Sequence, residues 1–336
     1  MPHVFVIAEA GVNHNGSIDL ALRLIDVAKA SGADAVKFQT FRADLLATRS
    51  AHKASYQTRT TAHNESQFEM LQRLELDATA HQCLIDHCRQ IGIQFLSSPF
   101  DAQSADLLAT LDVPLFKIPS GEITNLPFLK HLARKGRPLI LSTGMSTLGE
   151  VEEAVNVLHA AGASQLTLLH CVTEYPAPYA EVNLRAMQTL KVVFGLPVGY
   201  SDHTSGIEIA IAAVALGAEV IEKHFTLDRS LPGPDHAASL EPAELQQMVA
   251  AVRHVEVALG NGIKAPAPCE LPNISVARKS VVASRLLRAG RQLTPEDLDI
   301  KRPGNGLAPK LLPMLIGRTL RADLAKDEII RWEHLA

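Results

Sequence analysis

The chain has 336 residues, 47% of them hydrophobic and 20% charged, which suits one large domain of about 250 residues and a small second one. A net charge of -4, without a basic run, excludes a nucleic-acid or anionic-membrane surface. No apolar run approaches the ~18 residues that span a bilayer, and no cationic leader opens the chain, so we expect a cytoplasmic protein with small-molecule partners. Four irregularly spaced cysteines predict reduced thiols.

Short runs rich in Val, Ile and Phe alternate with longer segments whose apolar residues recur every three or four positions. This alternation predicts strand–helix units. The predicted strands cover residues 4–11, 35–41, 94–100, 115–122, 138–144, 165–172, 196–203 and 219–226. Eight units in about 260 residues predict a (β/α)8 barrel, and a doubly wound sheet is the competing arrangement.

Each predicted strand begins apolar and ends polar. The polar ends are Glu9, Lys37 with Gln39, Ser97 with Ser98, Lys117 with Ser120 and Glu122, Ser142 with Thr143, His170 with Thr173, Ser201 with Asp202 and His203, and Lys223 with His224. A single polar strand end is commonly a turn or cap residue. In a barrel, however, all eight carboxyl ends open onto one face, so these groups converge on one pocket. Eight polar ends in succession therefore favour the barrel.

Two cations lie inside otherwise apolar strands. Lys37 and Lys117 would be covered on both faces of a barrel strand, where an unpaired ammonium group is costly. Simple ion pairs with Glu9 and Glu122 are one solution. The other is a bound carboxylate or phosphate, for which hydroxyl groups stand at Ser98, Ser120 and Ser201.

Two histidines end consecutive strands. His203 and His224 would be neighbours in a closed barrel, beside the carboxylate residues Asp202 and Glu222, so we expect them to share one divalent metal ion. The segment HQCLIDHC, residues 81–88, has the right residue types for a metal site, but helical spacing divides them between two faces. It is interpreted as a helix surface.

The pattern changes after residue 262. Pro266, Pro268 and Pro272 predict a stiff, extended linker over residues 263–277, which separates a first domain of residues 1–262 from a second of residues 278–336. The second domain is small enough to need packing against something else. Its loop KRPGNG, residues 301–306, is interpreted either as a solvated surface loop or as an arm that contacts an anion or polyol.

Taken together, the stretches IAEAGVNHNGS, VKFQTF, FKIPSGE, ILSTGMS, LLHCVTEYP, GYSDHT, EKHFTLDRSLPGPDHAASLEP, SVVAS and IKRPGNG resemble the N-acetylneuraminate (sialic acid) synthases and the related legionaminic acid synthases over essentially the whole chain. The resemblance implies a (β/α)8 TIM barrel followed by a small antifreeze-like SAF domain in a domain-swapped homodimer. It also implies that phosphoenolpyruvate condenses with an N-acyl mannosamine to a nine-carbon 2-keto acid and phosphate, with a divalent metal such as Mn or Mg.

The resemblance also assigns roles to residues. Glu9 and Glu122 would stabilise a developing cation or move protons. Arg302 would reach the sugar in the partner subunit. The residues implied for phosphoenolpyruvate are Lys37, Gln39, Ser98, Lys117 on the phosphate, Ser120, Thr173, Tyr175 and Ser201; those for the sugar are Glu122, Asp235 and Arg302; and those for the metal are His203 and His224.

The exact sugar is left open at this stage. We expect an N-acetylneuraminate synthase that uses N-acetylmannosamine, with an N,N'-diacetyllegionaminate synthase that uses 2,4-diacetamido-2,4,6-trideoxymannose as the alternative. Two departures bear on this choice: Thr173 stands where other members show Asn, and Arg278 with Lys279 replaces an aromatic that contacts the acyl group in some relatives. Two rivals are remote: a pyruvate-dependent metal aldolase would not need Lys117 and a set of phosphate donors, and a non-catalytic glycan- or ice-binding protein would need an uncharged face where the second domain carries many charges.

Overall fold

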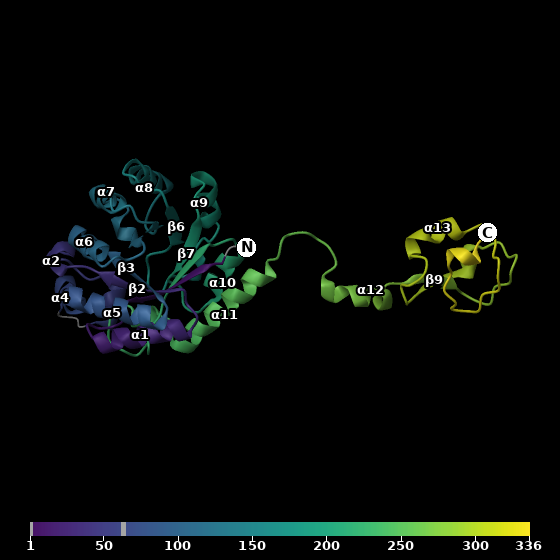
Figure 1. The fold of residues 1–336 in the computed structure, drawn as a ribbon, viewed down its shortest axis with the longest axis horizontal. Helices are drawn as coiled ribbons and strands as arrows, with labels where there is room; N and C mark the ends of the chain where they lie inside the picture. The colour runs from purple at the N-terminus through teal and green to yellow at the C-terminus, as the bar shows by residue number, and fades with distance from the viewer. Residues whose placement is uncertain (1–2, 62–64) are drawn as a thin grey trace. The chain divides into compact units, whose positions relative to one another are not determined.

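The computed structural model describes residues 3–61 and 65–336. The chain divides into two compact units, Met1–Asn261 and Gly262–Ala336, drawn in Figure 1 from purple to green and from green to yellow. None of the helices in the described part is long and apolar enough to cross a membrane.

Eight parallel strands form the centre of the first unit. They are β1 (Phe5–Gly11), β2 (Ala35–Thr40), β3 (Gln94–Pro99), β4 (Phe116–Ile118), β5 (Leu139–Ser142), β6 (Leu166–Cys171), β7 (Val198–Asp202) and β8 (Val220–His224). The first strand pairs with the last, in the order β3-β2-β1-β8-β7-β6-β5-β4, and β3 also lies beside β4. A doubly wound sheet does not bring its first and last strands together in this way, so the predicted barrel is confirmed.

A helix follows each strand and packs on the outside of the barrel (Figure 1). These helices are α1 (Ile18–Ala30), α5 (Ala78–Ile91), α6 (Ala102–Thr110), α7 (Leu126–Ala133), α8 (Leu148–Ala160), α9 (Ala186–Phe194), α10 (Glu208–Ala215) and α11 (Pro242–Ala258). Side-chain caps start several of them; Asp77, for example, accepts a hydrogen bond from Ala80 N at the start of α5. Gly92 ends the same helix at φ 73°, a conformation that favours glycine.

The segment HQCLIDHC lies on α5, but it is not simply a surface. His81 and Cys88 are buried, because α5 turns that face toward the barrel, and His81 Nε2 lies 2.7 Å from Thr40 Oγ1. His87 on another face lies 2.7 Å from Asp26 Oδ1. The interpretation as a plain helix surface was therefore wrong for one face, while the predicted division of these residues between faces is confirmed.

Three short helices connect β2 to α5, and the sequence analysis missed them. They are α2 (Ala43–Leu46), α3 (Ser55–Thr60) and α4 (Gln67–Leu74). Met70 and Leu74 of α4 bury their side chains against Val12 and Phe41, which follow the ends of β1 and β2. The connection is thereby fixed beside the carboxyl ends of the strands.

The second unit has its own apolar core. It contains α12 (Leu271–Ala277), the antiparallel pair β9 (Ser280–Ala283) and β10 (Leu298–Lys301), and α13 (Leu312–Leu315). Asp297 is fully buried and accepts hydrogen bonds from Arg285 Nη2 and Arg291 Nε, both at 2.8 Å. The linker expected to be extended is helical over its last part, because Pro272 occupies the first turn of α12, where a missing N–H costs nothing.

Candidate active site

The inside of the barrel is filled in layers, because alternate residues of each strand point inward. The lowest layer is an apolar cluster of Ile7, Ala35, Leu96, Ile140, Leu169 and Val220. Two residues further along the same strands stand Glu9, Lys37, Ser98, Ser142, Cys171 and Glu222, and all six line one pocket. The pocket has a volume of about 330 Å³. Its floor is therefore the point at which the barrel changes from apolar to charged.

The charged layer holds two lysines between two carboxylates. Lys37 Nζ lies 2.7 Å from Glu9 Oε2 and 3.6 Å from Glu222 Oε2, and it donates to Ser98 Oγ at 3.0 Å. Lys117 Nζ lies 3.3 Å from Glu222 Oε1. All four charged side chains are at most 4% exposed. Of the two carboxylates considered as ion-pair partners, Glu9 does pair with Lys37, but Glu122 contacts Asn125 instead, and Glu222 takes its place between the lysines.

The pKa values of the two lysines and the two glutamates are shifted in different directions. Burial alone would lower the pKa of Lys37, but Glu222 and Glu9 outweigh it and raise that pKa. Burial and the neighbouring Lys37 lower the pKa of Lys117 despite the attraction of Glu222. Burial would raise the pKa of Glu222, but Lys117 and Lys37 hold it at about 2. Burial raises the pKa of Glu9 to about 7. Of the two lysines, Lys117 is therefore the one whose charge is less well neutralised by nearby carboxylates. This is expected of a group that receives an anionic ligand.

Hydroxyl and thiol groups form the wall beside Lys117. Gly144 N donates to Ser120 Oγ at 2.9 Å, and Ser120 Oγ lies 3.1 Å from Cys171 Sγ. A Cβ atom at Gly144 would come within 2.4 Å of Thr173 Oγ1, so only glycine fits there. Within the described chain, Thr173 Oγ1 and Ser142 Oγ are buried without a hydrogen-bond partner. These groups can bind the oxygens of a small anion.

His203 and His224 meet at the pocket, with ring centroids 5.6 Å apart. Tyr175 packs against both rings, at 4.2 Å from His203 and 5.5 Å from His224. Asp202, expected beside His203, points to the opposite side of β7 and pairs with buried Lys223 at 2.8 Å. The expected carboxylate neighbour Glu222 does face the pocket.

The histidine pair fits a divalent metal ion. Burial lowers the pKa of His203 to about 4 and that of His224 well below its usual value, so both rings are neutral. His203 Nδ1 lies 2.6 Å from Val172 O, which places the lone pair of the neutral ring on Nε2, the atom that would bind a metal and that now lies 3.4 Å from Ser201 Oγ. His224 Nδ1 is buried and has no hydrogen-bond partner in the described chain. No third His, Cys, Asp or Glu of the described residues completes a cluster with them, so substrate or water would fill the remaining positions.

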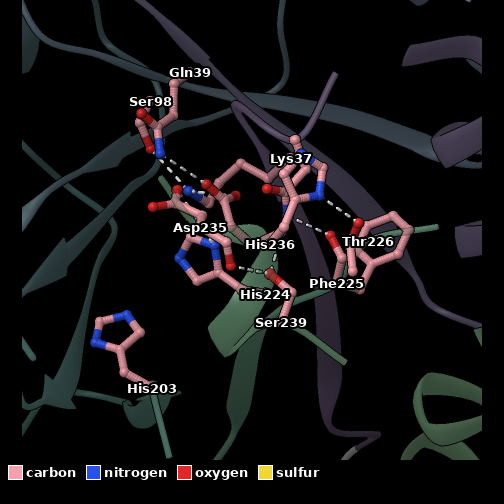
Figure 2. A network of polar contacts seen from close by, with 12 residues as sticks. Lys37, Gln39, Ser98, His203, His224, Phe225, Thr226, Asp235, His236 and Ser239 are labelled. Atoms are coloured by element: carbon pink, nitrogen blue, oxygen red, sulfur yellow. Dashed lines mark hydrogen bonds and ion pairs between the residues drawn. The ribbon is translucent and has the colours of Figure 1, made fainter. Parts of the chain in front are cut away.

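Asp235 lies beside the histidine pair, with its Oδ2 atom 3.8 Å from His224 Nδ1 (Figure 2). Its backbone oxygen accepts a hydrogen bond from Ser239 Oγ at 2.7 Å, and Asn13 Nδ2 donates to Ser239 Oγ at 3.0 Å and to Phe225 O at 2.8 Å. The loop after β8 is therefore fastened to the loop after β1.

A second set of hydrogen bonds joins the same two loops. His236 Nδ1 lies 2.6 Å from Thr226 Oγ1, as Figure 2 shows, and His236 Nε2 lies 3.3 Å from Asn15 Oδ1. Asn15 Nδ2 donates to Pro232 O at 2.8 Å. Gly233 sits between them at φ 151°, where a Cβ atom would meet His236 and Asn15 within 3 Å. These contacts fix the backbone that carries Asp235.

Most predicted site residues come together in the pocket, but two do not line it. The predicted residues that line it are Glu9, Lys37, Gln39, Ser98, Lys117, Ser120, Thr173, Tyr175, Ser201, His203, His224 and Asp235. Glu122 is half-buried and accepts a hydrogen bond from Asn125 Nδ2 at 2.7 Å. Arg302 belongs to the second unit, where its Nε donates to Ala277 O at 3.1 Å. The roles of these two residues stay predictions.

Sequence reasoning named Glu222 only as a neighbour of His224 and missed its contact with the two lysines. Glu222 stands two positions before His224 on β8, so the period of two along the strand was a usable signal for its inward direction. Tyr56, whose ring lies 4.9 Å from that of Tyr175, comes from the undetected helix α3, and no sequence signal pointed to it.

Comparisons with known proteins agree with this arrangement. A model of the NeuB family matches residues 24–264, and a model of the SAF domain matches residues 278–336. The chain belongs to the NeuB family. Its relatives include N,N'-diacetyllegionaminic acid synthases from Campylobacter jejuni, 53% identical over 98% of this chain and 100% of the relative, and from Legionella pneumophila, 49% identical over 98% and 94%.

One similar protein of known structure is more distant in sequence than these two relatives. The N-acetylneuraminic acid synthetase of Leptospira borgpetersenii, crystallised with citrate, is 37% identical and superposes with a TM-score of 0.71 over 81% of this chain and 90% of its own. The identities therefore favour the legionaminic alternative over the N-acetylneuraminate synthase that the sequence analysis put first.

The histidine pair gives a metal-binding prediction. We expect His203→Ala or His224→Ala to weaken Mn binding by about a hundredfold or more, because each removes one of the two protein ligands. Calorimetric titration of the purified protein measures this. His87→Ala on the outer face of α5 serves as the control. An unchanged affinity in either pocket variant, or an equal loss in the control, would contradict the assignment.

Asp235 gives a pH-dependent prediction. Burial raises its pKa to about 6, from a usual value near 4 in the unfolded chain, so its ionisation destabilises the folded state as pH rises through this window. We expect Asp235→Asn, studied in chelator, to be more stable than wild type at pH 7.5 by up to ~3 kcal/mol, and the gain to vanish near pH 4. Urea unfolding followed by circular dichroism measures it.

The control for this prediction is Asp106→Asn on α6. Contacts with Lys135 and His131 lower the pKa of Asp106, so its replacement is expected to change stability with the opposite sign. A loss of stability in Asp235→Asn at pH 7.5 would mean that the carboxylate is stabilised in the folded state.

Proposed function

We propose that the protein is an N,N'-diacetyllegionaminic acid synthase, which condenses phosphoenolpyruvate with 2,4-diacetamido-2,4,6-trideoxymannose. The observation that carries this proposal is the identity of 53% and 49% with two enzymes of that name over 98% of the chain. The charged pocket supports it, since a buried, under-compensated Lys117 and unpaired hydroxyl groups suit a phosphate ester.

In the proposed reaction, the pocket holds phosphoenolpyruvate over the charged layer and the open-chain sugar near the histidine pair. A bond forms between C3 of phosphoenolpyruvate and the aldehyde carbon of the sugar, which leaves a cation at C2. Water then adds to C2, and phosphate leaves with cleavage of its C–O bond. Holding the two reactants together contributes roughly 7–11 kcal/mol when alignment is good.

The chain's own residues have distinct tasks in this reaction. Lys117 and the hydroxyl groups near Gly144 hold the phosphate, and Glu222 lies close enough to the lysines to stabilise positive charge at C2. Glu9, with a pKa of about 7, can accept or release a proton at neutral pH. His203 and His224 would hold the divalent cation, such as Mn or Mg, which when bound would polarise the aldehyde oxygen as a Lewis acid.

A product assay tests the proposed function. We expect phosphate release from phosphoenolpyruvate only when metal and the 2,4-diacetamido sugar are both present, with a nine-carbon product of matching mass. N-acetylmannosamine is expected to be turned over at least about tenfold less efficiently. Better turnover with N-acetylmannosamine would instead support an N-acetylneuraminate synthase, and turnover with pyruvate would support the aldolase.

We also propose that the protein works as a domain-swapped homodimer in which Arg302 of the partner subunit contacts the sugar. The loop KRPGNG places Arg302 on the surface of the small second unit, exposed to solvent. Mixing subunits that carry Arg302→Ala with subunits that carry His203→Ala should restore activity, because one of the two mixed sites is then intact. Absence of any rescue in a confirmed heterodimer would place Arg302 in its own subunit's site.

A further inference from the structure

The pocket has two chemically different halves. One half consists of the charged and hydroxyl-bearing strand ends described above. The other half is supplied largely by α2, α3 and α4 and their neighbours. Its residues are Val12, Leu46, Tyr56, Gln57, Gln67, Met70, Leu71, Leu74 and Phe100. Among these described residues none is charged.

The apolar side chains of this second half are held firmly. Leu46, Leu71 and Phe100 are half-buried and pack against the buried cluster formed by Val12, Phe41, Met70 and Leu74. Helices α2 and α4, which carry Leu46 and Leu71, lie against each other. We call Leu46 and Leu71 the leucine wall.

The polar groups nearby are mostly engaged with the protein itself. Gln57 Oε1 accepts a hydrogen bond from Ala54 N at 2.9 Å, and Gln57 Nε2 lies 3.4 Å from Tyr56 Oη. Gln67 stands one helical turn before Leu71 on α4. The two leucines themselves, Leu46 and Leu71, offer only carbon to a hydroxyl group seated between them.

The position of the uncharged half of the pocket determines which part of a bound sugar contacts it. Tyr56 of α3 packs on Tyr175, which packs on His203. Under the proposed function, on which this step rests, the aldehyde end of the sugar lies at the histidines and phosphoenolpyruvate lies over the lysines. The far end of the extended sugar then has the α2–α4 side of the pocket to occupy.

We propose that the leucine wall is the subsite for C6 of the sugar and selects a methyl group over a hydroxymethyl group. Burying a hydroxyl group without a hydrogen-bond partner is unfavourable, whereas a methyl group gains from the same contact. An apolar pocket of this kind discriminates between such substituents by about tenfold to a hundredfold. The wall thus makes the protein specific for 6-deoxy sugars, separately from any recognition of the substituent at C4.

Binding of two unreactive sugar alcohols tests the wall. They are the alditol of N-acetylmannosamine and its 6-deoxy counterpart, which differ only at C6 and lack the reactive aldehyde. Calorimetry with Mn and phosphoenolpyruvate present gives both dissociation constants. We expect the 6-deoxy alditol to bind wild type at least about tenfold more tightly, and this ratio to fall toward one in Leu46→Ser and in Leu71→Ser.

Leu45→Ser is the matched control, since Leu45 neighbours Leu46 on α2 but is 45% exposed and does not line the pocket. It should keep the wild-type ratio. The ratio compares two ligands on one preparation, so partial unfolding of a variant does not alter it. Equal affinities in wild type, or an unchanged ratio in both wall variants, would overturn the proposal. Failure of the proposed function appears separately, as absence of turnover with the 2,4-diacetamido sugar.

Discussion

Two ammonium groups buried inside the barrel require negative charge beside them. Lys37 and Lys117 are each about 3% exposed, and an isolated charge at such a depth is strongly unfavourable. Glu9 and Glu222 supply part of the compensation from the neighbouring strands. Buried ion pairs of this kind add little to stability compared with apolar residues of the same volume. The cluster is therefore best understood as a binding site that keeps one cation, Lys117, ready for a further anion.

The strand period of two explains why much of this site was predictable. Apolar strand starts and polar strand ends predicted the barrel, and inward direction follows from counting along each strand. Glu9, Lys37 and Lys117 were found in this way. Glu122 was misjudged as an ion-pair partner because β4 ends at Ile118 and residues 120–122 turn into a 3-10 helix, so the alternation no longer applies. The same period, applied to β8, directs Glu222 inward, toward the lysines that it contacts.

The uncharged half of the pocket was not predictable in the same way. Helices α2, α3 and α4 are short, and short helices take their stability from tertiary packing more than from their own sequence. Leu46 and Leu71 become pocket residues only because α4 packs on Val12 and Phe41, which are distant in the sequence. Likewise, Asp235 was predicted from a family motif, but the contacts that fix its backbone were not. Those hydrogen bonds come from the Asn13 loop and depend on β1 and β8 meeting where the barrel closes.

The affinity of the Lys117→Met variant for phosphoenolpyruvate tests the central claim most directly. Methionine keeps much of the length of lysine but carries no charge, so the variant removes the cation with little change in packing. If the charged layer binds the phosphate, calorimetry should show phosphoenolpyruvate binding weakened by about a hundredfold while binding of the unreactive sugar alcohols is unchanged. An unchanged affinity for phosphoenolpyruvate, or an equal loss for both ligands, would contradict the account.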